Sequence, residues 1–215
     1  MKNIIVLDIE TKNDFAEVGG RENMHLLEIS VVGMYSYNKD EFFVLRENEL
    51  DKLKSIVQEA SLIIGFNIKG FDFPVMKKHL NGIDIEKLPL LDLMDQPRDY
   101  LKFRPSLNAL TSATFKKKKI ADGLEAIKMY RDGRMDELEK YCLDDVKLTR
   151  DLYEYGKKEG KVMFFDFKVA GEYAIPVSWG EDNQNQKSSL GPRNSPNVSV
   201  NGSGAPGAPR QKSLF

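Results

Sequence analysis

Asp8 and Glu10 flank Ile9 at the end of an apolar segment that begins at Asn3. In a β-strand, side chains alternate between the two faces, so both carboxylates would share one face and Ile9 would occupy the other. Two acids on one strand face repel each other unless a positive charge, such as a divalent cation, lies between them. The pair therefore indicates either a cation site or a strand end that meets solvent.

Asp72 is a third candidate acid. It follows Asn67, which comes after an expected strand over 61–66, and it precedes Pro74 in an expected short helix over 73–80. Proline is accepted in the first turn of a helix, so this segment is consistent with a helix start. Asp72 could equally be a simple N-cap.

Tyr141 and Asp145 lie four residues apart in an expected helix over 135–157, and this spacing puts both on one face. They lie at the margin of the apolar side formed by Leu138, Cys142 and Val146. This placement permits a pair that faces a cleft, but it is also compatible with a solvated aspartate.

The three segments occur in the order Asp-x-Glu, Asn-x-x-x-Phe-Asp and Tyr-x-x-x-Asp, and together they resemble the tyrosine-bearing branch of the DEDD exonuclease superfamily. The residues of these motifs are also similar to those in the exonuclease domain of family B DNA polymerases and in free-standing bacterial relatives. The resemblance covers residues 3–155 and includes the segments 91–94 and 104–110. Neither His25 nor His79 lies in a motif, which disfavours the histidine-bearing branch.

This resemblance implies metal-dependent 3′-5′ exonuclease chemistry. Asp8 would bridge two Mg²⁺ or Mn²⁺ ions, Glu10 and Asp145 would bind the ion that activates water, and Asp72 would support the second. Tyr141 would orient the water rather than remove its proton, because a phenol with a pKa near 10 is a poor base at neutral pH. Zinc is not expected, because the motifs contribute no histidine or cysteine ligand.

Several further residues are candidates for substrate contact. Thr11 and Asn67 would lie near the terminal nucleotide, whereas Phe71 and Leu107 could pack on its base or sugar or belong to the core. Lysines at 116–119, which include Lys116 and Lys117, could contact phosphates or form a solvated loop. Lys102 and Arg104 are similar candidates.

The expected fold is α/β. Apolar runs over 3–9, 27–37 and 41–46 predict an antiparallel meander, and strands over 61–66 and 88–93 alternate with helices over 49–60 and 73–80. Further helices are expected over 106–115, 123–132 and 135–157, and a strand or hairpin over 160–175. The resemblance implies a ribonuclease-H-like mixed sheet flanked by helices.

The composition divides the chain into three parts. Residues 1–178 form the expected catalytic domain, 179–210 a disordered linker rich in Gly, Ser, Asn and Pro, and 211–215 a terminal peptide. Gln211, Leu214 and Phe215 resemble the short peptide that binds bacterial sliding clamps. Leucine and phenylalanine at the end of a polar tail gain nothing without a partner that buries them.

The net charge of −1 gives no global attraction to polyanions, although bound cations would reverse the local field of an acidic cluster. The single cysteine and the lack of a long apolar segment predict a cytoplasmic protein without a membrane span. We expect an exonuclease acting on DNA, with single-stranded 3′ ends as the substrate, in replication or repair. An RNA exonuclease and an inactive module that binds nucleic acid or a clamp are the alternatives.

Overall fold

The computed structural model describes residues 3–116, 123–167 and 170–180. Lys117 and the three candidate clamp-binding residues, Gln211, Leu214 and Phe215, lie outside the described residues, as does nearly all of the expected linker. No helix in the described ranges is both long enough and apolar enough to cross a membrane.

A mixed five-stranded sheet forms the centre of the domain, with the strands in the order β3-β2-β1-β4-β5. β1, β2 and β3 pair antiparallel, whereas β4 and β5 run parallel to β1. The expected meander followed by parallel strands is therefore confirmed. The strand bounds are Ile4–Thr11, Ile29–Ser36, Glu41–Arg46, Leu62–Gly65 and Leu90–Asp92 for β1 to β5.

Six α-helices occur in the part of the chain that the structure describes. They are α1 (Leu53–Glu59), α2 (Asp72–Met76), α3 (Asp95–Leu101), α4 (Leu107–Phe115), α5 (Gly123–Arg131) and α6 (Met135–Glu159). The sequence did not predict α3. Short 3₁₀ turns split two expected helices: η2 (Glu47–Lys52) precedes α1, and η3 (Lys77–His79) follows α2.

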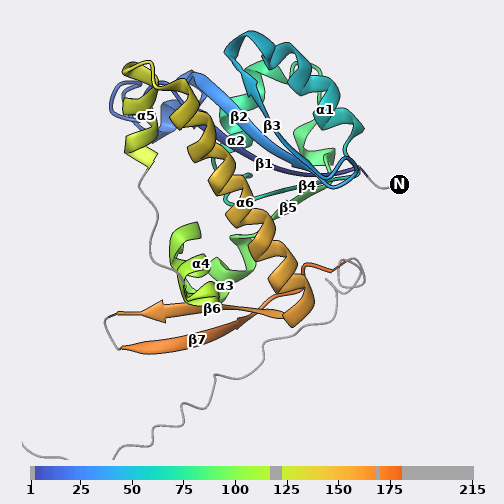
Figure 1. The fold of residues 1–215 in the computed structure, drawn as a ribbon, viewed down its shortest axis with the longest axis vertical. Coiled ribbons are helices and arrows are strands. Elements are labelled where there is room, and N and C mark those ends of the chain that lie inside the picture. The colour runs from blue at the N-terminus through green and yellow to red at the C-terminus, as the bar shows by residue number, and fades with distance from the viewer. Residues whose placement is uncertain (1–2, 117–122, 168–169, 181–215) are drawn as a thin grey trace, which may run out of the picture.

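Both faces of β1 are covered. Ile5, Leu7 and Ile9 point into one core with residues of α1 and α2, whereas Val6 packs in a second core with Val146 of α6. In Figure 1, α6 runs diagonally across the sheet, from α5 at one end to the second sheet at the other. Because Asp8 and Glu10 share the parity of Val6, the fold directs both carboxylates towards α6.

The chain after α6 forms a hairpin, as expected for residues 160–175. β6 (Lys161–Asp166) pairs antiparallel with β7 (Gly171–Pro176), and together they form a separate two-stranded sheet. Trp179 is fully buried, and its ring lies so close to Gly156 of α6 that a Cβ there would be 2.3 Å from it. Glycine at position 156 therefore lets the end of the described chain pack on α6.

Candidate metal centre

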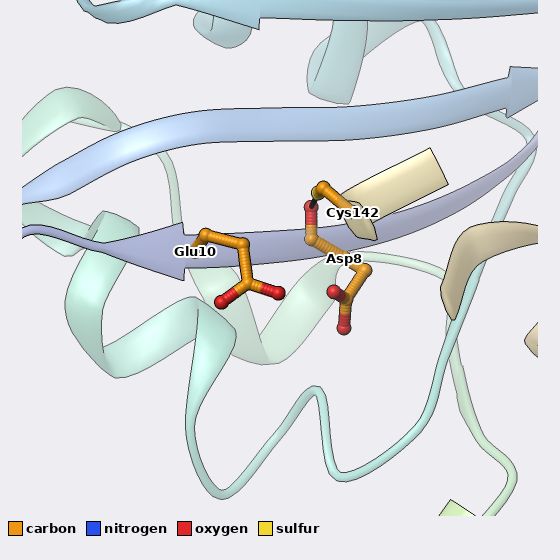
Figure 2. Close-up of side chains that lie close together, drawn as sticks. All are labelled: Asp8, Glu10 and Cys142. Carbon is orange, nitrogen blue, oxygen red and sulfur yellow. Dashed lines mark hydrogen bonds between the residues drawn. The ribbon is translucent and has the colours of Figure 1, made fainter. Parts of the chain in front are cut away.

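Asp8 and Glu10 are the first two side chains of the candidate site. Figure 2 shows both carboxylates extending from the same strand, β1, as the alternation predicts. Burial raises the pKa of Asp8 well above its ordinary value, and the charges of Asp72, Glu10 and Asp145 raise it further. Burial and the charges of Asp145 and Asp72 likewise raise the pKa of Glu10. The structure therefore brings together all four acids that the sequence singled out.

Asp72 reaches the cluster because β4 is short. β4 ends at Gly65 and pairs with β1 only as far as Val6, so the edge of β1 beyond that point is open on this side. Asp72 is the first residue of α2, and its buried carboxylate accepts hydrogen bonds from the main-chain N–H of Ile9 and from its own. It is not an N-cap, since Phe71 takes that position. Burial raises the pKa of Asp72 to about 7, against these hydrogen bonds.

Tyr141 and Asp145 come from the N-terminal half of α6. Burial and then the charge of Asp144 raise the pKa of Asp145 to about 6, whereas a hydrogen bond with the Tyr141 side chain lowers it. One turn of helix thus connects the expected water-orienting hydroxyl directly to an expected metal ligand.

Gly33 explains how α6 comes so close to the sheet. It lies directly opposite Asp8 on β2. A Cβ at position 33 would be 2.7 Å from the Cys142 sulfur and 3.0 Å from a Val146 methyl carbon. Only a glycine leaves room for α6 at this distance, and α6 carries Tyr141 and Asp145 on the adjoining positions.

Cys142 lies at the edge of the cluster, although the sequence analysis expected no cysteine ligand there. Its Sγ and carboxylate oxygens of Asp8 and Glu10 lie within 4.8 Å of one another. The thiol donates a hydrogen bond to the main-chain carbonyl of Asp8 at 3.7 Å (Figure 2). Burial raises the pKa of the thiol well above its ordinary value. Without a metal, the Cys142 thiol is therefore protonated.

The four carboxylates fit hard divalent cations. Each has a pKa raised chiefly by burial, and no Lys or Arg among the described residues forms an ion pair with any of them. Buried like charges are costly unless a cation compensates them. A donor set of carboxylate oxygens is the type preferred by Mg²⁺ and Mn²⁺.

Two of the candidate substrate residues make local hydrogen bonds. The Thr11 hydroxyl is buried and donates to the carbonyl of Asn13 at 2.9 Å. Asn67 has a left-handed backbone with φ of 64°, and its side-chain oxygen accepts a hydrogen bond from the Arg104 guanidinium. Asn67 thus lies in the loop that leads to Asp72 and has a cationic neighbour.

The remaining substrate candidates divide between packing and surface. Phe71 packs edge-on against Phe15 with the ring centroids 6.0 Å apart, and Leu107 packs against the core next to α6. Lys116 ends α4 and forms an ion pair with Glu172 of β7. These placements are compatible with the core alternative for Phe71 and Leu107, and they give Lys116 a carboxylate partner.

Sequence reasoning assigned no role to Asp92. This carboxylate is buried at the end of β5 and accepts main-chain hydrogen bonds from Asn67 at 2.8 Å, Met94 at 3.0 Å and Lys69 at 3.1 Å. It thereby holds the loop that positions Asn67 and Asp72. The sequence did offer one signal for Asp92: like Asp8, it is an aspartate at the end of an apolar run.

The family model of the ribonuclease H superfamily matches residues 5–156, which is more than half of the 215-residue chain. The chain belongs to the ribonuclease H superfamily. The matched segment of this superfamily member begins in β1 and ends near the end of α6, so it contains every residue of the carboxylate cluster. A comparison with curated protein sequences finds no match.

Two solved structures are similar to this ribonuclease H superfamily member at low identity. One is the family B DNA polymerase from the hyperthermophilic archaeon Pyrobaculum calidifontis, with 17% identity, a TM-score of 0.56, and coverage of 73% of this chain and 24% of the polymerase. The other is the zinc-ion-bound E. coli ExoI-ssDNA complex, with 14% identity, a TM-score of 0.38, and coverage of 66% and 42%. The chain thus spans less than half the length of either protein.

Proposed function

We propose that this chain is a two-metal-dependent 3′-5′ exonuclease that hydrolyses the phosphodiester bonds of DNA. The observation that carries the proposal is the convergence of four carboxylates from β1, α2 and α6 on one place without a compensating cation among the described residues. A binding module has no need to concentrate acids where phosphates must approach. Membership of the ribonuclease H superfamily supports the same conclusion.

Asp8, Glu10, Asp72 and Asp145 would hold two Mg²⁺ or Mn²⁺ ions. When bound, such ions would supply an activated water on one side of phosphorus and stabilise the departing 3′-oxygen on the other. Tyr141 orients the water through its hydroxyl, which the hydrogen bond with Asp145 already holds in place. Gly33 sets the distance between the strand carboxylates and those two residues.

A degradation assay on 5′-labelled substrates tests direction and substrate together. Single-stranded DNA, duplex DNA and RNA of one sequence are incubated with Mg²⁺ or Mn²⁺. We expect a ladder of progressively shorter labelled products from single-stranded DNA. Immediate release of labelled mononucleotide would contradict the 3′-5′ direction, and faster degradation of RNA would make RNA the substrate. If no polymer were degraded with either metal, the chain would be an inactive binding module.

Asp145→Asn and Asp151→Asn form a matched pair for this assay, because both replace an aspartate of α6. Asp151 forms ion pairs with Lys147 and Arg150 and lies outside the carboxylate cluster. We expect Asp145→Asn to remove the activity and Asp151→Asn to retain it. Equal activity of the two variants would exclude Asp145 from the mechanism.

We also propose that the terminal peptide at 211–215 binds a bacterial sliding clamp and tethers the enzyme in replication or repair. The support is the sequence alone: Gln211, Leu214 and Phe215 end a polar tail with two apolar side chains. Such a short peptide gains most of its binding free energy from these two anchors, and tethering raises the local concentration of the domain at DNA.

Calorimetry of the full chain with a purified clamp tests the tail. We expect micromolar affinity, which Leu214→Ala combined with Phe215→Ala abolishes while hydrolysis of short oligonucleotides continues. Val200→Ala, in the same tail, is the control and should bind normally. Binding that survives the double substitution would refute the proposed peptide and leave the nuclease proposal intact.

A further inference from the structure

Arg104 extends the candidate centre towards α4. It lies between α3 and α4, it is exposed, and its guanidinium donates to the side-chain oxygen of Asn67. Its Nη2 also lies 3.0 Å from the position of a Cβ built on Gly70, two residues before Asp72. Because the amide of Asn67 is neutral, this hydrogen bond does not compensate the positive charge of Arg104, and Arg104 forms no ion pair with another described residue. A cation with such a partner remains able to bind a phosphate.

Phe103 continues the surface from Arg104 to the hairpin. Its side chain is 47% exposed, and its ring packs edge-on against Phe164 of β6 with centroids 5.5 Å apart. Phe164 is directly opposite Tyr173 of β7, which is 36% exposed. Residues that face each other across a strand pair point to the same side of the sheet. Phe103 and Tyr173 therefore lie on one face of the hairpin, and we call them the aromatic platform.

A second aromatic pair occupies the opposite face of the hairpin. Phe165 has the opposite parity from Phe164, and it packs edge-on with Phe167 at 4.9 Å between centroids. Phe167 is 88% exposed, the highest value among the exposed large apolar side chains of the described residues. Within the described part of the chain, no ring contact or hydrogen bond joins this pair to Arg104 or Asn67, so the pair serves as a comparison.

Both neighbours of Phe103 in the sequence are cationic, Lys102 and Arg104, and both are exposed. Aromatic rings next to positive charges are the combination with which proteins bind single strands, because bases stack on the rings and phosphates meet the cations. Figure 1 shows the hairpin beneath α3 and α4, near the end of α6 that lies away from α5.

We propose that Arg104 and the aromatic platform form a docking surface for single-stranded nucleic acid, upstream of the nucleotide that enters the carboxylate cluster. This inference rests on the proposed function for its direction, because it places the 3′ end at the cluster and the preceding bases on Phe103 and Tyr173. Stacking on these rings requires splayed bases, which a paired duplex does not offer. The surface thus selects single strands over duplexes.

Fluorescence anisotropy with the full chain tests the platform. All proteins carry Asp145→Asn, which prevents hydrolysis, and the probe is a 5′-labelled twelve-nucleotide single strand of deoxythymidine. We expect Phe103→Ala to weaken binding about five- to a hundredfold, the range for loss of one stacking partner. Phe103→Leu preserves packing on Phe164 and should show a similar loss, which separates stacking from folding. Phe167→Ala should bind as tightly as the parent.

Arg104→Gln tests the phosphate contact separately. Glutamine keeps a donor for Asn67 but removes the charge, so the dependence of log K on log salt should become shallower by about 0.7. An unchanged slope would show that Arg104 does not contact a phosphate and is not part of the docking surface. The same titration with Phe103→Leu should retain the parental slope, since that substitution changes no charge.

The outcomes distinguish this surface from the nuclease proposal. An unchanged affinity in Phe103→Ala and Phe103→Leu, or a loss confined to Phe167→Ala, would overturn the platform whether or not the parent enzyme degrades DNA. A shift from dimer to monomer in Phe103→Ala with unchanged strand affinity would assign the face to a second copy of the chain and would equally overturn it. Strand affinity that depends on Phe103 in a chain without hydrolytic activity would support the surface and reject the exonuclease.

Discussion

Two buried acidic regions of this domain differ in what surrounds the carboxylates. Asp92 accepts three main-chain hydrogen bonds, and each of them lowers its pKa against the effect of burial. Asp8 and Glu10 experience burial and neighbouring negative charges, and every one of these influences raises the pKa. Asp92 is thus supplied with donors by the chain itself, and Asp72 is so in part. The main influences on Asp8 and Glu10 include no such donor, so a bound cation is the compensation that these two strand carboxylates would use.

The largest expected effect comes from replacing one acid of the cluster. Asp8→Asn should abolish hydrolysis, because Asp8 is expected to contact both ions, and should stabilise the metal-free protein by relieving repulsion. Turnover of a labelled oligonucleotide and thermal unfolding in a chelator measure the two effects. Near-normal turnover, or a lower melting temperature without metal, would contradict the contrast between the two regions.

Tyr141→Phe should lower kcat by roughly ten- to a thousandfold, because the ring remains and only the hydroxyl that orients the water is lost. Metal affinity measured by calorimetry with Mn²⁺ should change little. If the substitution weakened metal binding and left kcat unchanged, Tyr141 would act through Asp145 alone. Tyr130→Phe, on the neighbouring helix α5, serves as the control and should leave kcat at the parental value.

Asp92→Ala should act on stability in the opposite direction from Asp8→Asn. It leaves three main-chain N–H groups without their carboxylate acceptor, at a cost of about 2–4 kcal/mol in the free energy of unfolding. Urea denaturation in a chelator provides the measurement. Because Asp92 holds the loop before Asp72, we also expect weaker metal binding. An unchanged unfolding free energy would show that Asp92 has no structural role.

The smallest expected effect is the pH dependence of stability without metal. Folding raises the pKa of Asp145 to about 6 and that of Asp72 to about 7, from ordinary values near 4. The folded state therefore binds more protons than the unfolded state. The contribution of these two groups to the free energy of unfolding is fully present below pH 4 and is lost as the pH rises through 6 to 7. We expect the free energy of unfolding in a chelator to fall between pH 5 and pH 8.

Saturating Mn²⁺ should reverse this trend, because metals bind the deprotonated carboxylates. Thermal unfolding across this pH range, with and without the metal, measures both slopes. If stability in the chelator increased from pH 5 to pH 8, other groups of the protein would compensate the negative charge of the cluster.

The sequence predicted those parts of the site and fold that depend on local spacing. Period-two alternation placed Asp8 with Glu10, and the helical repeat placed Tyr141 with Asp145. α3 was missed, because Pro97 and three charged residues interrupt any apolar repeat over Asp95–Leu101. The close approach at Gly33 and the hydrogen bonds of Asp92 were also missed. Both depend on contacts between segments distant in sequence, which no local spacing encodes.

The cluster is drawn from positions near both ends of the matched segment, and Asp145 follows Asp8 by 137 positions (145 − 8). A ribosome that adds about 5–20 residues per second needs about 7–27 s to cover that interval. During this time the chain carries Asp8 and Glu10 but has no α6 to complete the centre. If the proposed function holds, a growing chain would therefore be unable to cut nucleic acid beside its own ribosome, and hydrolysis would begin only when α6 docks.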